Sequence, residues 1–216
     1  MKHIYLFLFI VLLSACSRPE VPAKYAQADK LPTLYPDYTN VTIPCNIAPL
    51  NFAVVEAGAD KVVARFTTPD GTQSVFGSSQ KIAIALDDWK EMLSKARGDK
   101  MQVEVWTSDN DSWKAYTPFS IFVANDSIDP YISYRLIQPS YVGYEELRIE
   151  QRCLEDFSTR DIYNNMSIST ETKGQCINCH SYQNYKTDNM LFHIRKDWGG
   201  TIIVRDGGKP MRVNLK

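Results

Sequence analysis

Short runs of strand-forming residues dominate the chain from Val41 to about Tyr134. These runs are rich in valine, phenylalanine and other residues that suit a half-buried sheet, and turn signals such as Thr68-Pro69-Asp70-Gly71 separate them. The expected strands cover residues 52–56, 61–67, 73–76, 81–86, 101–107, 113–116 and 119–123. Strands this short and regularly spaced predict a β-sandwich domain over 40–134.

One helix interrupts this pattern. Asp87 or Asp88 is the expected N-cap, and Gly98 is expected to end the helix. The apolar residues between them fall at i, i+3, i+4 and i+7, namely Trp89, Met92, Leu93 and Ala96. The domain with its single helix resembles immunoglobulin and fibronectin-III modules, a fold that indicates little about function by itself.

Beyond the sandwich the pattern changes, and 135–216 is expected to form a separate region. The stretch up to Thr172 has many tyrosines, and we expect mostly irregular structure there. Residues 145–151 could be a polar-alternating strand or a helical turn, whereas 154–166 has no clear period. The tail predicts an extended segment at 190–195 and a β-hairpin of 201–205 and 211–215 around a glycine-rich turn. The predicted fold class is therefore mainly β.

The first residues have the form of a secretory signal. Lys2 precedes an apolar run from Ile4 to Leu13 that is too short to span a bilayer, and Leu13-Ser14-Ala15-Cys16 follows at once. This tetrapeptide resembles the lipobox of bacterial lipoproteins, which implies cleavage after residue 15 and lipidation of Cys16. The alternative is an ordinary signal with an incidental cysteine. We expect 16–39, rich in proline, alanine and charged residues, to be a lipid-anchored tether.

The motif that carries chemistry is Cys176-Ile177-Asn178-Cys179-His180. A C-x-x-C-H pentapeptide is typical of covalent haem c attachment, in which the thiols of Cys176 and Cys179 add to the two vinyl groups and His180 ligates the iron. Haem attachment of this kind takes place outside the cytoplasm, in agreement with the signal. We therefore predict one covalent haem c.

A sixth iron ligand has to come from elsewhere, unless the iron is five-coordinate. His193 is the first choice and Met190 the second, with Met166 and Met211 as further candidates. If 190–195 is extended, His193 and Arg195 share one face, and Arg195 is then placed near a haem propionate.

Composition limits the classes of binding partner that the protein can have. The net charge is −1, and loss of Lys2 with the signal makes it −2, with no basic block that would suit nucleic acid. Lipidation and haem attachment account for three of the five cysteines and leave Cys45 and Cys153. In an oxidising compartment this pair predicts a disulfide, and the alternative is two small buried hydrophobic side chains.

Three stretches carry a family resemblance. They are Tyr35-Pro36-Asp37-Tyr38, the run 43–52 around Cys45, and the haem motif followed by Met190-Leu191-Phe192-His193-Ile194-Arg195. They resemble lipoproteins of the Bacteroides group that are described as cytochrome c-type or TolB-like proteins. In those proteins a β-propeller follows the haem segment, whereas this sequence reaches Lys216 without such repeats. It is therefore expected to be a shortened form, or a segment that ends where a propeller begins.

The leading hypothesis is a membrane-anchored monohaem c-type protein in extracytoplasmic electron transfer or redox sensing. No acidic run follows Cys16, and we therefore expect the protein to be sorted to the outer membrane and to face the periplasm. Its redox or protein partner is unidentified. No catalytic dyad or triad is visible. The alternative is a non-haem lipoprotein that binds protein or glycan, with the pentapeptide forming a structural disulfide or, with His193, a zinc site. A C-x-x-C thiol oxidoreductase lacks the expected βαβ context.

Overall fold

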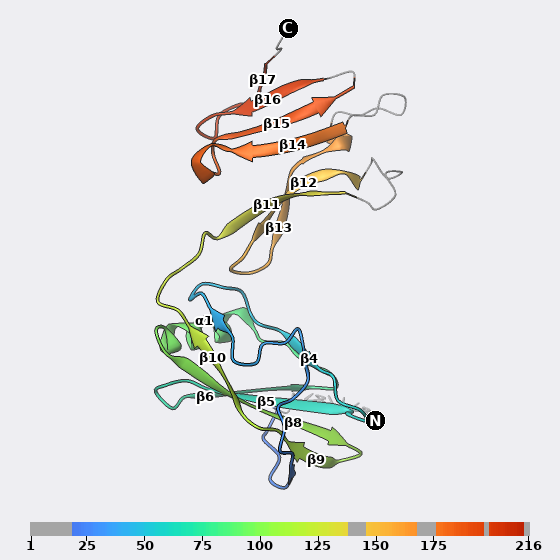
Figure 1. The fold of residues 1–216 in the computed structure, drawn as a ribbon, viewed down its shortest axis with the longest axis vertical. Coiled ribbons are helices and arrows are strands. Elements are labelled where there is room, and N and C mark those ends of the chain that lie inside the picture. The colour runs from blue at the N-terminus through green and yellow to red at the C-terminus, as the bar shows by residue number, and fades with distance from the viewer. Residues whose placement is uncertain (1–18, 138–145, 168–175, 197–198, 214–216) are drawn as a thin grey trace, which may run out of the picture. The chain divides into compact units, whose positions relative to one another are not determined.

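The computed structural model describes residues 19–137, 146–167, 176–196 and 199–213 (Figure 1). They form two compact units, the first from residues 19–43 and 50–125 and the second from 44–49 and the described residues from 126 onwards. The division falls before the expected 134/135 boundary, because residues 126–134 and the short segment 44–49 both belong to unit 2. Within the described ranges, none of the helices is long and apolar enough to cross a membrane.

Unit 1 is built on β8 (Lys100–Asp109), which pairs with β5 along one edge and with β9 and β10 along the other. Its larger sheet contains β1 (Ala26–Gln27), β3 (Thr42–Ile43), β5 (Lys61–Thr67), β6 (Gln73–Ser78), β8, β9 (Ser112–Ala115) and β10 (Phe119–Val123). A smaller sheet contains β2 (Leu34–Tyr35), β4 (Phe52–Val54) and β7 (Lys81–Ile82). The predicted mainly β class is confirmed, and the paired sheets are consistent with a sandwich.

The helix α1 (Leu86–Ala96) covers part of the larger sheet with the predicted apolar stripe. Its four stripe residues are buried, and the Trp89 ring meets Phe66 of β5 edge to face at 6.4 Å. The predicted aspartate cap is wrong: the N-cap is Ala85, which makes no side-chain cap bond. Asp87 and Asp88 instead lie in the first turn, where a negative charge suits the helix dipole.

The segment 19–39 is part of unit 1, which corrects the expected tether for these residues. β1 pairs with β9, β2 pairs with β4, and the Tyr25 ring lies 6.1 Å from that of Trp106. Lys30 Nζ also forms a 2.8 Å ion pair with Glu56. The two-residue strands have too little sequence to show a period, so the pattern did not reveal them. Cys16 lies outside the described residues.

Unit 2 contains a three-stranded and a four-stranded antiparallel sheet. The first contains β11 (Tyr131–Leu136), β12 (Arg148–Cys153) and β13 (Thr159–Asn164), so the prediction of irregular structure there is wrong. The second contains β14 (Cys176–Tyr182), β15 (Met190–Arg195), β16 (Gly200–Val204) and β17 (Met211–Val213). The predicted extended segment and C-terminal hairpin are confirmed, apart from residues 214–216, which are not described.

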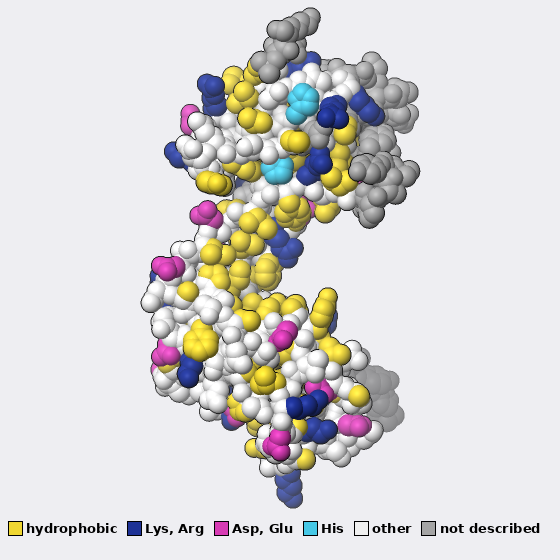
Figure 2. Space-filling view, viewed as in Figure 1, with side chains coloured by type: hydrophobic (Ala, Val, Ile, Leu, Met, Phe, Trp, Pro, Cys, Tyr) yellow, Lys and Arg dark blue, Asp and Glu magenta, His cyan; other side chains and the backbone are white. Residues whose placement is uncertain are grey.

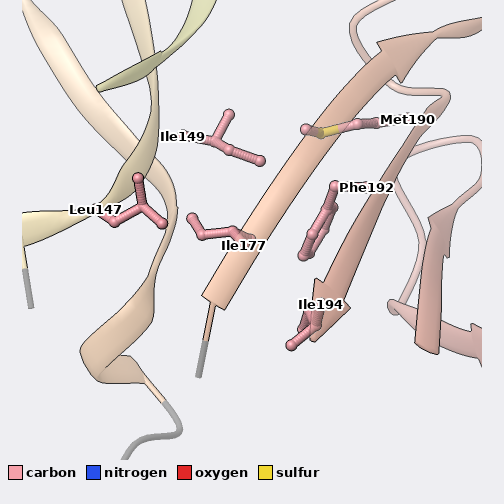
Figure 3. Packing of buried hydrophobic residues seen from close by; sticks show 6 residues of the cluster. All are labelled: Leu147, Ile149, Ile177, Met190, Phe192 and Ile194. Carbon is pink, nitrogen blue, oxygen red and sulfur yellow. The ribbon is translucent and has the colours of Figure 1, made fainter. Parts of the chain in front are cut away.

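A hydrophobic cluster joins the two sheets of unit 2 (Figure 3). Ile149 of β12 meets Ile177 of β14 and the buried side chains of β15. The six buried members are Leu147, Ile149, Ile177, Met190, Phe192 and Ile194. We call the side of the four-stranded sheet that packs on this cluster the inner face, and the opposite side the outer face.

The segment 44–49 lies against the first sheet of unit 2. The Ala48 N–H donates to the Leu154 carbonyl at 2.7 Å, and the Cys45 N–H donates to the Asp126 carbonyl at 3.4 Å. Cys45 and Cys153 thus belong to neighbouring segments of one unit, although the described residues contain no disulfide between them.

The turn between β5 and β6 predicts a pH-dependent stability. The Thr68 hydroxyl donates to Asp70 at 2.5 Å and the Thr72 N–H donates to it at 3.0 Å, which together hold the pKa of Asp70 at about 2. Because the folded pKa lies below that of the unfolded chain, the stabilisation is present above about pH 4 and is lost as the pH falls towards 2. We expect Asp70→Asn to be less stable than wild type at pH 5, with a difference that shrinks on acidification in urea unfolding. Thr68→Ser, which keeps the hydroxyl, should behave like wild type, and a constant difference from pH 5 to 2 would contradict this assignment.

Candidate functional site

The C-x-x-C-H pentapeptide forms β14, an edge strand that pairs with β15 (Figure 1). Ile177 pairs with Ile194 and His180 pairs with Phe192, so the register shifts between them. Two residues of β14, Asn178 and Cys179, therefore oppose the single residue His193 of β15. This two-against-one arrangement is a β-bulge.

The bulge assigns His180 to the inner face. Its partner Phe192 is buried in the hydrophobic cluster, and directly paired residues share one face of a sheet. The His180 ring is half-buried and lies 6.2 Å from the ring of Tyr182, edge to face. The Tyr182 hydroxyl lies 2.7 Å from Ser133 Oγ on β11, which fixes this face towards the three-stranded sheet.

The same bulge places Cys179 and His193 on the outer face, where both are exposed. His193 Nδ1 lies 3.4 Å from the hydroxyl of Thr201, its cross-strand neighbour on β16. When Nδ1–H donates to this hydroxyl, Nε2 keeps the lone pair that can bind a metal ion. The predicted faces of 190–195 are confirmed, because Met190, Phe192 and Ile194 are buried whereas His193 and Arg195 are exposed.

Cys176 lies at the start of β14, opposite Arg195. Its side chain is half-buried and contacts the edge of the hydrophobic cluster. Its thiol is 3.7 Å from the Ile177 carbonyl, a weak contact. Of the two motif cysteines, Cys179 is therefore the more accessible.

The donor set suits a covalent haem only in part. Cys179, His193 and Arg195 are exposed on the outer face, whereas Cys176 is half-buried against the edge of the cluster. His180 and His193, however, lie on opposite faces of one sheet, so they cannot bind the same iron while β14 and β15 remain paired. Met190, the second choice, is 6% exposed within the cluster on the face of His180. Figure 2 shows the side-chain types on one side of the molecule, with histidine in cyan.

The zinc alternative needs Cys176, Cys179, His180 and His193 around one ion. The bulge divides the two histidines between the faces, and no three His, Cys, Asp or Glu side chains in the described part of the chain are arranged to hold a metal ion.

Three groups of the three-stranded sheet have shifted pKa values, and the pKa of Tyr134 is raised by its hydrogen bond to Glu150. The Tyr134 hydroxyl donates to Glu150, and this bond, with the 3.0 Å bond from Arg148 Nε, keeps the pKa of Glu150 below its ordinary value. Burial raises the pKa of Tyr163, whose ring lies 5.2 Å from Phe192. Tyr163 packs against Phe192 on the inner face of β15, whereas Glu150 belongs to β12 of the three-stranded sheet.

The sequence pattern did not identify the outer-face residues besides Cys179, His193 and Arg195. Thr201 contacts His193, and Leu191, Ile203 and Met211 form an apolar row beside it. The alternation of 190–195 already places Leu191 with His193, but the strand pairing is needed to align Ile203 and Met211 with it.

No protein-family model matches the chain, and no curated protein is similar to it. The resemblance to cytochrome c-type lipoproteins of the Bacteroides group therefore stays a prediction.

The placement of the cysteines predicts an order of reactivity. In haem-free protein made without residues 1–15, iodoacetamide should modify Cys179 first, half-buried Cys176 more slowly and buried Cys153 most slowly, because access to the sulfur limits the reaction. Peptide mass spectrometry over a time course gives the three rates. Equal rates for Cys153 and Cys179 would contradict the described packing.

Proposed function

We propose that this protein is a membrane-anchored lipoprotein with one covalent c-type haem, acting in electron transfer or redox sensing outside the cytoplasm. The observation that carries this proposal is the C-x-x-C-H pentapeptide on the edge strand β14, with Cys179 exposed at a bulge. A signal that ends in a lipobox-like Leu13-Ser14-Ala15-Cys16 supports the same compartment.

Four residues of the chain would bind the proposed haem. Cys176 and Cys179 would hold the haem by two thioether links, in which each thiol adds across a vinyl group, the sulfur bonding to one carbon and the proton going to the other. His180, the motif histidine, would ligate the iron, and Arg195 would offer its charge to a propionate. When bound, such a haem supplies a one-electron couple whose potential depends on its axial ligands.

The lipid on Cys16 would keep this centre at the membrane, on the periplasmic side of the outer membrane. An anchor with three acyl chains on Cys16 exceeds the two membrane-binding signals that stable attachment requires. The redox partner would then meet the protein from the aqueous side. The mature chain is close to neutral, with −2 net charge, so this contact has little long-range electrostatic steering.

Covalent haem can be tested directly. We expect the full chain, expressed with its signal in a host competent for c-type maturation, to give a haem-peroxidase band on a denaturing gel. Cys176→Ala combined with Cys179→Ala should abolish the band, because both thioether links are lost.

The matched control is Cys45→Ala combined with Cys153→Ala, which removes two cysteines of the same unit and should keep the band. Absence of the band in the wild type, while a host cytochrome stains, would overturn the proposed function. It would favour the binding-module alternative.

A further inference from the structure

We infer that the β6 edge of unit 1 rests on the membrane surface, and that lipid headgroups cover a hollow beside this strand. The inference rests on the proposed function, because it needs the lipid on Cys16. It adds that unit 1 is held directly at the membrane, without the flexible tether that the sequence predicts for 16–39.

The first step is the length of chain between the lipid and the folded body. The described part of unit 1 begins at Pro19, three residues after Cys16. An extended chain spans at most about 3.6 Å per residue, so the Cα atom of Cys16 lies within about 11 Å of that of Pro19. A lipid on Cys16 therefore brings the membrane surface to the part of unit 1 that holds Pro19.

The second step is the position of Pro19, which packs against Gly77 of β6. A Cβ atom added at Gly77 would lie 2.8 Å from the Pro19 Cβ and 3.3 Å from Val63 Cγ2. The backbone of Gly77 lies outside the left-handed region, so a turn does not require a glycine there. The missing side chain at Gly77 instead leaves the space that Pro19 occupies on β6.

The third step is the fixation of the residues that follow Pro19. Val21 packs against the cluster of Val63, Trp106 and Ala115. β1 then pairs with β9 and continues this attachment to the larger sheet. The lipid is therefore joined to β6 through a segment that is packed and paired from Pro19 onwards.

A hollow of about 650 Å³ lies at the same place, and its lining includes Pro19, Gln73, Ser74, Phe76 and Asp88. The amide and hydroxyl groups can bond to a lipid phosphate, and the Asp88 carboxylate can pair with an ammonium group. Phosphatidylethanolamine carries both groups in one headgroup. A zwitterionic surface of this kind suits the lining better than a strongly anionic one, which the charge of Asp88 would repel.

The open edge of β6 is a further reason for a cover. β6 pairs with β5 alone, so its other edge has no strand partner among the described residues. Such an edge is a template for pairing with another chain, including a second copy of this protein. A membrane surface in contact with β6 would keep other chains away from this edge.

Lipid-borne quenchers test the orientation. The lipidated full chain would carry a fluorescent non-natural amino acid either at Ser79, exposed just beyond β6, or at Thr42, exposed on β3. β3 lies at the opposite edge of the larger sheet, four strand spacings or about 19 Å from β6. In phosphatidylethanolamine vesicles that contain a nitroxide-headgroup lipid, we expect several-fold stronger quenching at Ser79 than at Thr42. Each intensity is compared with that of the same protein in vesicles without the quencher, which removes any effect of the haem on the fluorophore.

A longer linker supplies the matched control. A glycine-serine insertion of about twelve residues between Cys16 and Pro19 adds a root-mean-square reach of about 20 Å, so the two positions should then be quenched more equally. Equal quenching without the insertion, or stronger quenching at Thr42, would overturn the inference and leave the proposed function standing. A second copy paired on β6 would give that result, because it would shield Ser79 from lipid. Failure to bind the vesicles, with Cys16 unmodified by mass spectrometry, would instead overturn the lipid anchor of the proposed function.

Discussion

The extra residue in β14 is the constraint on which the arrangement of the motif depends. Without the bulge, alternation along the strand would put Cys176 and Cys179 on opposite faces. With it, Cys179 stands opposite His193, while Ile177 and His180 both face the cluster. A single inserted residue therefore decides which histidine shares a face with Cys179. Bulges often occur next to functional sites, where they re-aim side chains in this way.

The hydrophobic cluster keeps the bulge in register. A slip of one residue between β14 and β15 would move Ile177 out of the cluster and bring an outer-face residue into it. The buried members of β15 oppose such a slip from the other strand, and Tyr182 adds a hydroxyl contact to Ser133 of β11. The scaffold and the candidate site thus depend on the same strand pair. Substitutions in the cluster are expected to disturb both.

Much of the fold could be predicted from local pattern, but the face assignment of the motif could not. Strands 61–67 and 119–123 have the predicted bounds, and the stripe of α1 and the alternation of 190–195 were also predicted correctly. The sequence left 145–151, which overlaps β12, open between a strand and a helical turn, because its polar residues pair across the sheet, as Gln151 does with Arg160, and so obscure the period. The bulge has no local signal at all, since it exists only through pairing with β15. The pentapeptide therefore predicts a chemistry, and the sheet determines where its residues point.

The central claim is that Cys176 and Cys179 hold one covalent haem. Mass spectrometry of the digested protein measures this most directly, because thioether bonds survive denaturation and digestion. In the full chain, expressed with its signal in a host competent for c-type maturation, we predict that the peptide containing both cysteines carries the mass of one haem. The same peptide with two unmodified cysteines, while a host cytochrome carries its haem, would contradict the account.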